Sequence, residues 1–514
     1  MKLFTKIIKK IFNRAVICVL GILLQITYLV LILWQFGLPY TYSYLIFQIT
    51  AIVISIFIVN SDINPSYKVT WIMTILILPV FGVLFYIFFE SDNSSKKLRK
   101  KMNEYAFAER EKLTQNEEVF NKLLDIKEPI EKQANYLYNY AGYPIYENSE
   151  TKYFPCGEDK FKAMLEELEK AEKFIFLEYF IINEGEMWNS ILDILVRKAA
   201  QGVDVRIVYD DIGCLLTLPY RYDRELEKKG LKCRVFNKFR PILTVKVNNR
   251  DHRKILIIDG KTAFTGGVNL ADEYINRYKK YGHWKDSAIM IKGQAVWSFT
   301  MMFLTMWNYV TNADTDEEDY EKFRPEQQNL KENGFVIPYT DSPLDNEPVG
   351  ENVYLNIVNS AKKYVYITTP YLIIDNEMKT ALTLAAKSGV DVRIITPGVP
   401  DKWYVHAVTR SNYQSLTKDG VKIYEYSPGF IHAKNFLSDD CFAVVGTINL
   451  DFRSLYLHFE CASLMYNTSC IPDIKSDYIE TLKQCKEITY EMCKKVNIFI
   501  RLGRMLLRLL APMM

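Results

Sequence analysis

The chain has 514 residues, of which 49% are hydrophobic and 24% are charged. This composition excludes a disordered, collagen-like or strongly acidic protein, and the length exceeds that of one compact domain. The formal net charge of +3 excludes the broad positive field with which proteins hold nucleic acid, so electrostatic recognition must be local. The nine cysteines include no CxxC pair and no Cys/His cluster, so we expect neither a zinc site nor a disulfide framework.

The first ninety residues contain two charge-free stretches, 15–61 and 69–89. They hold three apolar segments, 15–36, 43–59 and 69–89, each close to the ~20 residues with which a helix crosses a bilayer. Basic clusters precede the first segment and follow the last, and the positive-inside tendency places both clusters in the cytoplasm. Three crossings cannot satisfy both placements, so either one segment is re-entrant or interfacial, or one flank lies outside. We expect residues 1–89 to form a membrane anchor of two or three hydrophobic helices, with the rest of the chain in the cytoplasm.

Beyond the anchor, residues 90–140 are charged and helically patterned, which predicts a connector. The sequence GVDVRI then occurs twice, at 202–207 and 389–394, each time after a helical stretch and an upstream apolar strand. Strand, helix, glycine turn and strand form a right-handed βαβ unit. The fold class is therefore predicted as α/β, with two similar lobes (141–330 and 331–495), mostly parallel cores and pseudo-twofold symmetry.

The C-terminal residues 496–514 form the last predicted element. Arg501, Arg504 and Arg508 recur at helical spacing among apolar residues. This pattern is typical of a basic amphipathic helix that lies on a membrane surface, although a terminal helix docked on the core is the alternative.

One pattern of chemically active residues occurs in both lobes, with the second copy 180 positions after the first. Each copy has a histidine, a lysine two residues later, an aspartate five residues after the lysine and an asparagine ten residues after that. The copies are His252, Lys254, Asp259 and Asn269, and His432, Lys434, Asp439 and Asn449. Residues two apart on a strand share a face. If the lobes face each other, two imidazoles, two ammonium groups and two amides converge.

Such a set suits a phosphodiester. Lysine supplies positive charge to phosphoryl oxygens without a metal, and one neutral imidazole can attack phosphorus while the other, protonated, gives its proton to the leaving alcohol. The two histidines must therefore hold opposite protonation states. Asp286 and Glu460 follow the two motifs and are expected to orient the rings, the alternative being ordinary strand-end acids. We expect no metal and no cofactor.

The duplicated pattern resembles the HxKxxxxD motifs of the phospholipase D superfamily, and nearly the whole chain resembles bacterial cardiolipin synthases. The apolar N-terminus, Asn64-Pro65, Pro370-Tyr371 and Phe459-Glu460 have counterparts there. The resemblance implies a ping-pong phosphatidyl transfer at the bacterial cell membrane. In it, His252 attacks one phosphatidylglycerol, His432 protonates the departing glycerol, and a second phosphatidylglycerol resolves the phosphohistidine to give cardiolipin.

The resemblance makes all six motif residues candidate catalytic residues, supported by Asp286, Glu460, Asn269 and Asn449. Glu178, Tyr179 and Tyr371 are expected at strand ends near the cleft, where they contact lipid headgroups, unless they are core residues. His458 lies close to Glu460 in the sequence and is either structural or part of the site.

Three other functions remain open. The acceptor is water in a phospholipase D and another alcohol in a different phosphatidyltransferase. A membrane-tethered nuclease uses the same chemistry, but the chain lacks the basic and aromatic surface that binds nucleic acid, so no nucleic acid partner is expected. The third alternative is an inactive scaffold that binds anionic lipid.

Overall fold

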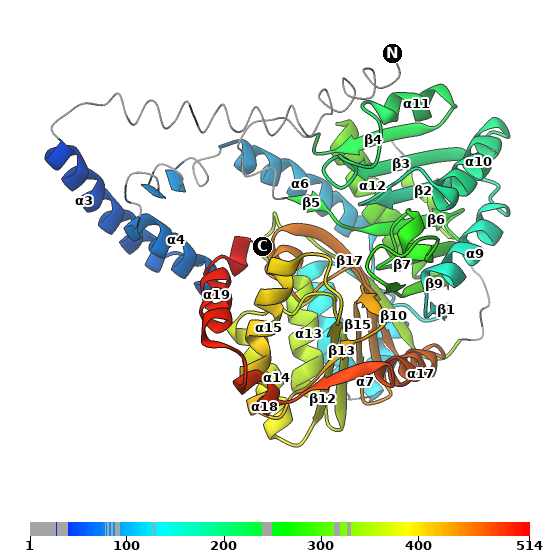
Figure 1. Ribbon diagram of the computed structural model, residues 1–514. Helices are drawn as coiled ribbons and strands as arrows, with labels where there is room; N and C mark the ends of the chain where they lie inside the picture. Colours follow the sequence, from blue (N-terminus) through cyan, green and yellow to red (C-terminus); the bar gives the residue numbers. More distant parts are fainter. Residues whose placement is uncertain are drawn as a thin grey trace, which may run out of the picture.

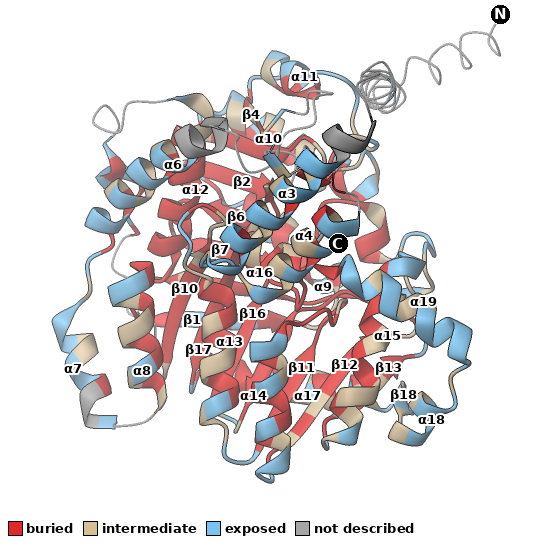
Figure 2. Cartoon of the chain, turned by 90° about the vertical axis from the view of Figure 1, so that its left-hand side faces the viewer, coloured by how far each residue is buried: buried red, intermediate tan, exposed pale blue. Residues whose placement is uncertain are grey.

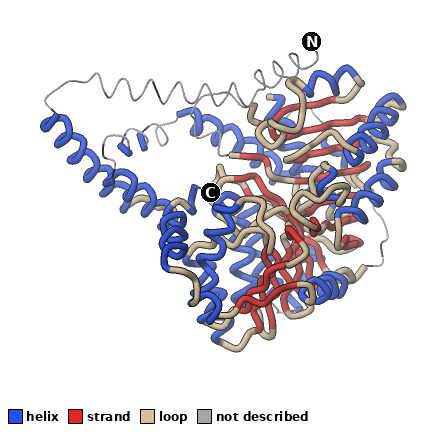
Figure 3. The backbone as a smooth tube through the Cα atoms, viewed as in Figure 1, coloured by secondary structure: helices blue, strands red, loops and turns tan. Residues whose placement is uncertain are grey.

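The structure is a computed structural model that describes residues 27, 40–77, 79, 82–83, 86–87, 93–126, 129–238, 249–312, 319–325, 330 and 332–513. Two α/β lobes meet along their sheets, and helices cover the outer faces (Figure 1). A tube view shows the strands of both lobes gathered at the centre of the molecule (Figure 3).

The first lobe has a sheet of seven strands in the order β1-β9-β7-β6-β2-β3-β4. The strands are β1 (Ser149–Phe154), β2 (Phe174–Tyr179), β3 (Asp204–Asp210), β4 (Lys232–Phe236), β6 (Lys254–Ile258), β7 (Thr262–Gly266) and β9 (Ala288–Gly293). The helices are α9 (Gly157–Leu168), α10 (Glu186–Ala200), α11 (Tyr222–Lys228) and α12 (Val296–Thr311).

The second lobe repeats this design. Its strands follow the order β10-β17-β16-β15-β11-β12-β13, which matches the first lobe strand for strand, with β18 added at the edge. The strands are β10 (Phe335–Asp341), β11 (Tyr364–Thr368), β12 (Asp391–Pro397), β13 (Lys422–Tyr426), β15 (Asn435–Ser438), β16 (Phe442–Gly446), β17 (His458–Tyr466) and β18 (Cys485–Ile488). The helices are α13 (Val349–Ser360), α14 (Asn376–Lys387), α15 (Trp403–Lys418), α16 (Phe452–Tyr456), α17 (Ile471–Leu482), α18 (Tyr490–Lys494) and α19 (Ile498–Leu509). The predicted duplication is confirmed.

The sheets are mixed, so the expectation of mostly parallel cores is wrong. Within the main order of each sheet, the parallel pairings join β2, β3 and β4, and likewise β11, β12 and β13, and every other pairing is antiparallel. The motif strands β6 and β7 are joined by a short turn with positive φ at Asp259 and Gly260, and a turn this short can connect only antiparallel strands. The repeated βαβ unit therefore accounts for only one side of each sheet.

The two lobes exchange short strands next to the motifs. β5 (Arg250–Asp251) of the first lobe pairs in parallel with the start of β17 in the second. Reciprocally, β14 (Gly429–Ile431) of the second lobe pairs in parallel with β8 (His283–Lys285) of the first. Each exchanged strand leads directly into a motif histidine, so this seam places both histidines.

One apolar core runs through both lobes. It joins residues of β2 and α12 to residues of β10, β11 and β16, and α12 is buried along most of its length. Colouring by burial shows red strands inside and pale blue helix faces outside (Figure 2). Because the lobes share this core, we expect them to fold as one unit.

The connector predicted over 90–140 contains α6 (Asn93–Lys112), α7 (Glu117–Ile126) and α8 (Pro129–Tyr136). Of the apolar segments, 15–36 lies outside the described residues except Thr27, 43–59 lies within α3 (Tyr40–Val59), and 69–89 is described in part, beginning in α4 (Pro65–Ile77). Among the described residues, no helix combines the length and apolarity that a bilayer crossing requires.

Candidate active site

The seam between the lobes holds the backbone of both motif histidines. The His252 N–H donates to the carbonyl of Phe459 at 2.9 Å, and the His432 N–H donates to the carbonyl of Lys285 at 2.7 Å. In each case the accepting residue lies in the other lobe and directly precedes a carboxylate. The strand exchange therefore sets each ring beside an acid of the opposite lobe.

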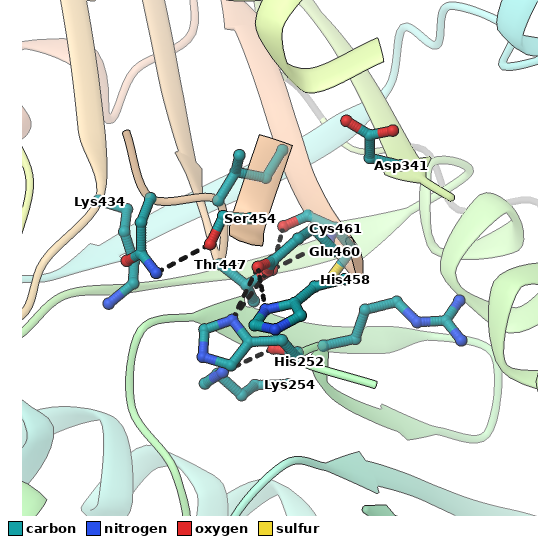
Figure 4. Close-up of polar contacts among 12 residues, drawn as sticks. His252, Lys254, Asp341, Lys434, Thr447, Ser454, His458, Glu460 and Cys461 are labelled. Carbon is teal, nitrogen blue, oxygen red and sulfur yellow. Dashed lines mark hydrogen bonds and ion pairs between the residues drawn. The ribbon is translucent and has the colours of Figure 1, made fainter. Parts of the chain in front are cut away.

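These acids are Glu460 and Asp286, and both are fully buried. His252 Nδ1 lies 2.9 and 3.0 Å from the two Glu460 oxygens, and His432 Nδ1 lies 2.7 Å from Asp286 Oδ2 (Figure 4 shows the His252 side). A carboxylate only accepts hydrogen bonds, so each Nδ1 carries the hydrogen and Nε2 is the nitrogen available to a substrate. The sequence identified both histidines and both acids, but not that each histidine contacts the acid of the opposite lobe.

The two motif lysines are buried beside the rings. Lys254 Nζ donates to the carbonyl of His252 at 2.6 Å, and Lys434 Nζ donates in the same way to His432. Burial lowers the pKa of Lys254 to about 8 and that of Lys434 to about 7. A negatively charged phosphodiester would stabilise both ammonium groups, so the site is electrostatically complementary to one.

Burial also lowers the pKa of both imidazoles, and the lysine ammoniums add to the effect. The pKa of His432 falls to about 4, although Asp286 acts in the opposite direction, and the pKa of His252 lies well below its usual value. Both rings are therefore neutral at neutral pH in the free site. The opposite protonation states expected from the sequence require the charge of a bound phosphodiester.

The motif copies differ at Gly267 and Thr447, and the structure explains why. A Cβ at Gly267 would lie 2.0 Å from Asp286 Oδ1, so only glycine leaves room for that carboxylate. At the matching place in the second lobe, the Thr447 hydroxyl donates to Glu460. Both residues thus fix the carboxylate of their own lobe.

The histidines open into a cavity of about 610 Å³ at the lobe interface. Its wall includes His252, His432, Asn269, Asn449 and Tyr371. Aromatic residues make up much of the remaining wall, and several basic side chains stand among them. The aromatic members are Phe180, Tyr274, Tyr281, Trp284, Tyr404 and Phe430, and the basic ones are Arg250, Lys280, Lys402 and Arg453. The wall also includes the acids Glu273, Asp401 and Asp451, so it offers both signs of charge around the polar headgroup, together with apolar surface for lipid chains.

Asp259 and Asp439 do not join this group, which corrects their assignment as catalytic residues. The Asp259 carboxylate accepts hydrogen bonds from the backbone N–H groups of residues 172–174 at 2.7–2.8 Å, at the start of β2. Asp439 does the same for residues 362–364 at the start of β11. Both acids lie at the ends of β6 and β15 away from the histidines, and they hold the lobe together.

Glu178 and Tyr179 also differ from expectation. Both are completely buried and neither lines the cavity. Glu178 forms an ion pair with Arg253 at 2.6 Å, and the Tyr179 hydroxyl receives a hydrogen bond from Lys160 at 3.4 Å. Phe180, the next residue, stands on the wall in their place. Tyr371 does lie on the wall, where its hydroxyl donates to Asp401 at 2.7 Å.

A third imidazole, His458, belongs to the site. Its ring centroid lies 5.5 Å from that of His252, its Nδ1 lies 3.6 Å from Glu460 Oε1, and it lines the cavity. His252, His458 and Glu460 each place a ligand atom within 4.8 Å of the other two, a spacing that a metal ion fits. The ammonium of Lys254 beside them opposes a divalent cation. Proximity to Glu460 in the sequence was the only signal for His458.

Comparisons with known proteins give a family match for both lobes. A family model described as "Cardiolipin synthase, PLD-like domain" matches residues 164–307 and 354–485, and one described as "Phospholipase_D-nuclease N-terminal" matches residues 49–90. A cardiolipin synthase of Alkalihalophilus pseudofirmus is 35% identical over 474 residues, covering 91% of this chain and 93% of that protein. An uncharacterized protein of Streptococcus mutans is 48% identical over 462 residues, covering 89% of this chain and 99% of that protein.

Among solved structures, the phosphatidylserine synthase of Haemophilus influenzae superimposes with a TM-score of 0.54 at 16% identity. The match covers 71% of this chain and 93% of that one, and it supports the two-lobed fold. The family model covers both lobes, and the cardiolipin synthase relative extends over nearly the whole chain. The chain belongs to the cardiolipin synthase family of phospholipase D-like phosphatidyltransferases.

Proposed function

We propose that the chain transfers a phosphatidyl group from one phosphatidylglycerol to another, giving cardiolipin and glycerol. The observation that carries this proposal is the pair of crossed histidine–carboxylate contacts around one cavity. Two imidazoles, each oriented by a buried acid and flanked by a lysine, form the acid–base and nucleophile set that phosphodiester exchange needs.

In the first half-reaction, Nε2 of His252 attacks phosphorus. The bond from phosphorus to the glycerol oxygen breaks, and protonated His432 gives its Nε2 proton to that oxygen. Glycerol leaves, and the phosphatidyl group stays on His252. The ammonium groups of Lys254 and Lys434 stabilise the charge on the phosphoryl oxygens.

In the second half-reaction, the neutral His432 accepts a proton from a hydroxyl of the second phosphatidylglycerol. The oxygen attacks phosphorus, the phosphorus–nitrogen bond breaks, and cardiolipin forms. One phosphodiester replaces another, so the exchange needs no ATP, and the proton on His432 is restored for the next turnover.

The pKa differences between the rings support this division of roles. Burial and the ammonium groups of Lys254 and Lys434 lower the pKa of His252, which favours a neutral nucleophile. His432 has Asp286 acting against the effect of Lys434, which makes its protonation easier once a phosphodiester binds. His432 is therefore suited to carry the proton that the leaving alcohol needs.

The protein is proposed to work at the bacterial cell membrane, with its catalytic lobes on the cytoplasmic side. Residues 1–89 would form a multi-pass anchor of two or three hydrophobic helices. Support comes from the charge-free stretches and from the exposed apolar side chains of α3, such as Phe57, which is 72% exposed. Alkaline carbonate extraction tests attachment, and protease protection in spheroplasts tests sidedness.

Reconstitution tests the reaction. The purified full-length chain in phosphatidylglycerol vesicles should produce cardiolipin and glycerol in equal amounts, and His252→Ala and His432→Ala should abolish both. Phosphatidic acid as the main product would instead identify water as the acceptor. Unchanged cardiolipin formation in both variants would exclude the proposed mechanism.

A further inference from the structure

We propose that a second pocket, between α15, α18 and α19, binds the phosphate of an anionic phospholipid whose acyl chains lie along the apolar face of α19. This pocket has a volume of about 410 Å³ and shares no lining residue with the catalytic cavity. We call it the arginine pocket. Its basic lining residues are Arg410, Lys418, Arg501, Arg504 and Arg508.

The arginine pocket is built for an anion. No acidic residue lines it in the described part of the chain, whereas serine, glutamine and tyrosine side chains stand among the five basic ones. Arg410 forms a bidentate pair with Glu425 at 2.7 and 2.7 Å, which fixes its guanidinium. Arg501, Arg504 and Arg508 form no ion pair with an acid among the described residues. Guanidinium groups bind phosphate through two parallel hydrogen bonds, so they suit this ligand.

The local electrostatics point the same way. Arg504 is half-buried, and its pKa is lowered by burial and by the positive charge of Arg410, although Glu425 acts in the opposite direction. Like charges brought together away from water cost free energy unless an anion lies between them. A phosphate in the arginine pocket would offset that cost.

The surface beside the pocket identifies the phosphate as part of a lipid. On α19, Phe499 is 78% exposed and Leu506 is 67% exposed, and Met505 at 57% borders the pocket itself. Figure 2 shows α19 as a mostly exposed helix beside α15. Arg501, Arg504 and Arg508 are three or four residues apart and so share one side of α19, whereas Phe499 and Leu506 are exposed beyond that side. A helix of this kind lies at the headgroup level of a bilayer with its apolar face in the acyl region.

The position of α19 is fixed by two neighbours. It packs along α15, and the carbonyl of Leu509 near its end accepts a hydrogen bond from the Thr70 hydroxyl of α4 at 2.9 Å. In Figure 1 the α3–α4 segment projects from the body next to α19. The apolar faces of these helices thus occur on the same side of the molecule as the arginine pocket, which is where a lipid surface would be met.

Helix α15 borders both sites. Tyr404 and Val405, in its first turn, line the catalytic cavity, whereas Arg410 and Lys418 line the arginine pocket. At 1.5 Å per residue, Val405 and Arg410 are about 8 Å apart along the helix. A lipid held by the arginine pocket would therefore lie close to the cavity without occupying it.

The test measures lipid binding by the full-length His252→Ala chain, which cannot turn lipid over, in an uncharged detergent. The probe is dihexanoyl phosphatidylglycerol. Two binding events are expected, one at each site. Replacing Arg501, Arg504 and Arg508 together by glutamine should weaken one of them by about tenfold or more and leave the other unchanged. Replacing all three by lysine should restore part of the lost affinity, because charge remains but the bidentate geometry does not.

Three controls make the result decisive. Replacing Lys228, Lys229 and Lys279 by glutamine removes the same charge from the first lobe and should leave both events intact. Dihexanoyl glycerol, which lacks the phosphate, should not fill the arginine pocket. Inorganic phosphate should bind there more weakly than the lipid. Equal losses in the lysine control, an unchanged second event in the glutamine variant, or inorganic phosphate binding as tightly as the lipid would each overturn the proposal.

Discussion

The two buried carboxylates can separate the roles of the two histidines. Asp286→Asn keeps the shape of the side chain but removes a negative charge 2.7 Å from His432 Nδ1. A hydrogen bond to a charged group contributes about 1.5–3 kcal/mol, and 1.36 kcal/mol corresponds to tenfold in rate. The variant should therefore release glycerol about 10- to 100-fold more slowly, because His432 is harder to protonate.

The leaving group then distinguishes the acid from the nucleophile. A phosphatidyl ester of p-nitrophenol loses a stable anion that needs no proton, so its cleavage does not depend on a general acid. With this substrate, the burst of nitrophenolate from Asp286→Asn should approach the wild-type rate. Glu460→Gln should stay slow with both substrates, because it disturbs His252, the proposed nucleophile.

A matched control is Asp341→Asn on β10, beside Glu460 in the sheet. Burial raises the pKa of Asp341 well above its usual range, and its carboxyl group accepts a hydrogen bond from the Gly350 N–H at 2.7 Å, so its replacement alters a buried acid beside Glu460 that orients neither histidine. Its burst rate should equal that of the wild type. If Glu460→Gln is the variant rescued by nitrophenol, the histidine roles are reversed. If the new leaving group rescues neither variant, the acid–base assignment fails.

Four further outcomes follow from the site. The pKa values of Lys434 (about 7) and Lys254 (about 8) mean that their charge is present at lower pH and lost as pH rises, so kcat/KM should fall on the alkaline side of this window in a pH profile. Asp259→Ala leaves three backbone donors without their acceptor and should lower the unfolding free energy by about 2–3 kcal/mol in denaturant titration, with kcat of the folded fraction unchanged. Gly267→Ala should displace Asp286 and reproduce the leaving-group dependence of Asp286→Asn; equal activity on both substrates would contradict this. Dialysis against EDTA should leave turnover intact, and a loss that Zn²⁺ restores would show a metal requirement.

The duplication and the motif residues were predictable because they repeat in the sequence with fixed spacing. The repeated hexapeptide identifies equivalent strands. The expectation that each histidine shares a strand with its lysine is wrong: His252 lies between β5 and β6, and His432 and Lys434 both lie between β14 and β15. The antiparallel half of each sheet was less accessible, because its signal is the short turn at Asp259 and not a helical crossover. Asp259 was assigned as catalytic because it belongs to the repeated motif. In the structure it lies in this turn, and its carboxylate accepts hydrogen bonds at the start of β2.

The wall of the cavity was predicted less well. β2 is buried along its whole length, so its last residues, Glu178 and Tyr179, have no alternation that tells an inward side chain from one facing the cavity. The cavity begins one residue later, at Phe180. Sequence spacing could not resolve that single position. The sequence also did not place His458 in the site, because its position beside His252 depends on pairing between β5 and β17 across the lobes.

This cross-lobe pairing also has a consequence for the chemistry. Each histidine takes its backbone hydrogen bond and its orienting carboxylate from the opposite lobe, so neither half contains a complete acid–base pair. A small rotation of one lobe against the other would change both histidine–carboxylate contacts at once. The shared apolar core resists that rotation, because it packs residues of α12 and β2 against β10 and β11. The core therefore maintains the distance between nucleophile and acid that an in-line exchange at one phosphorus demands.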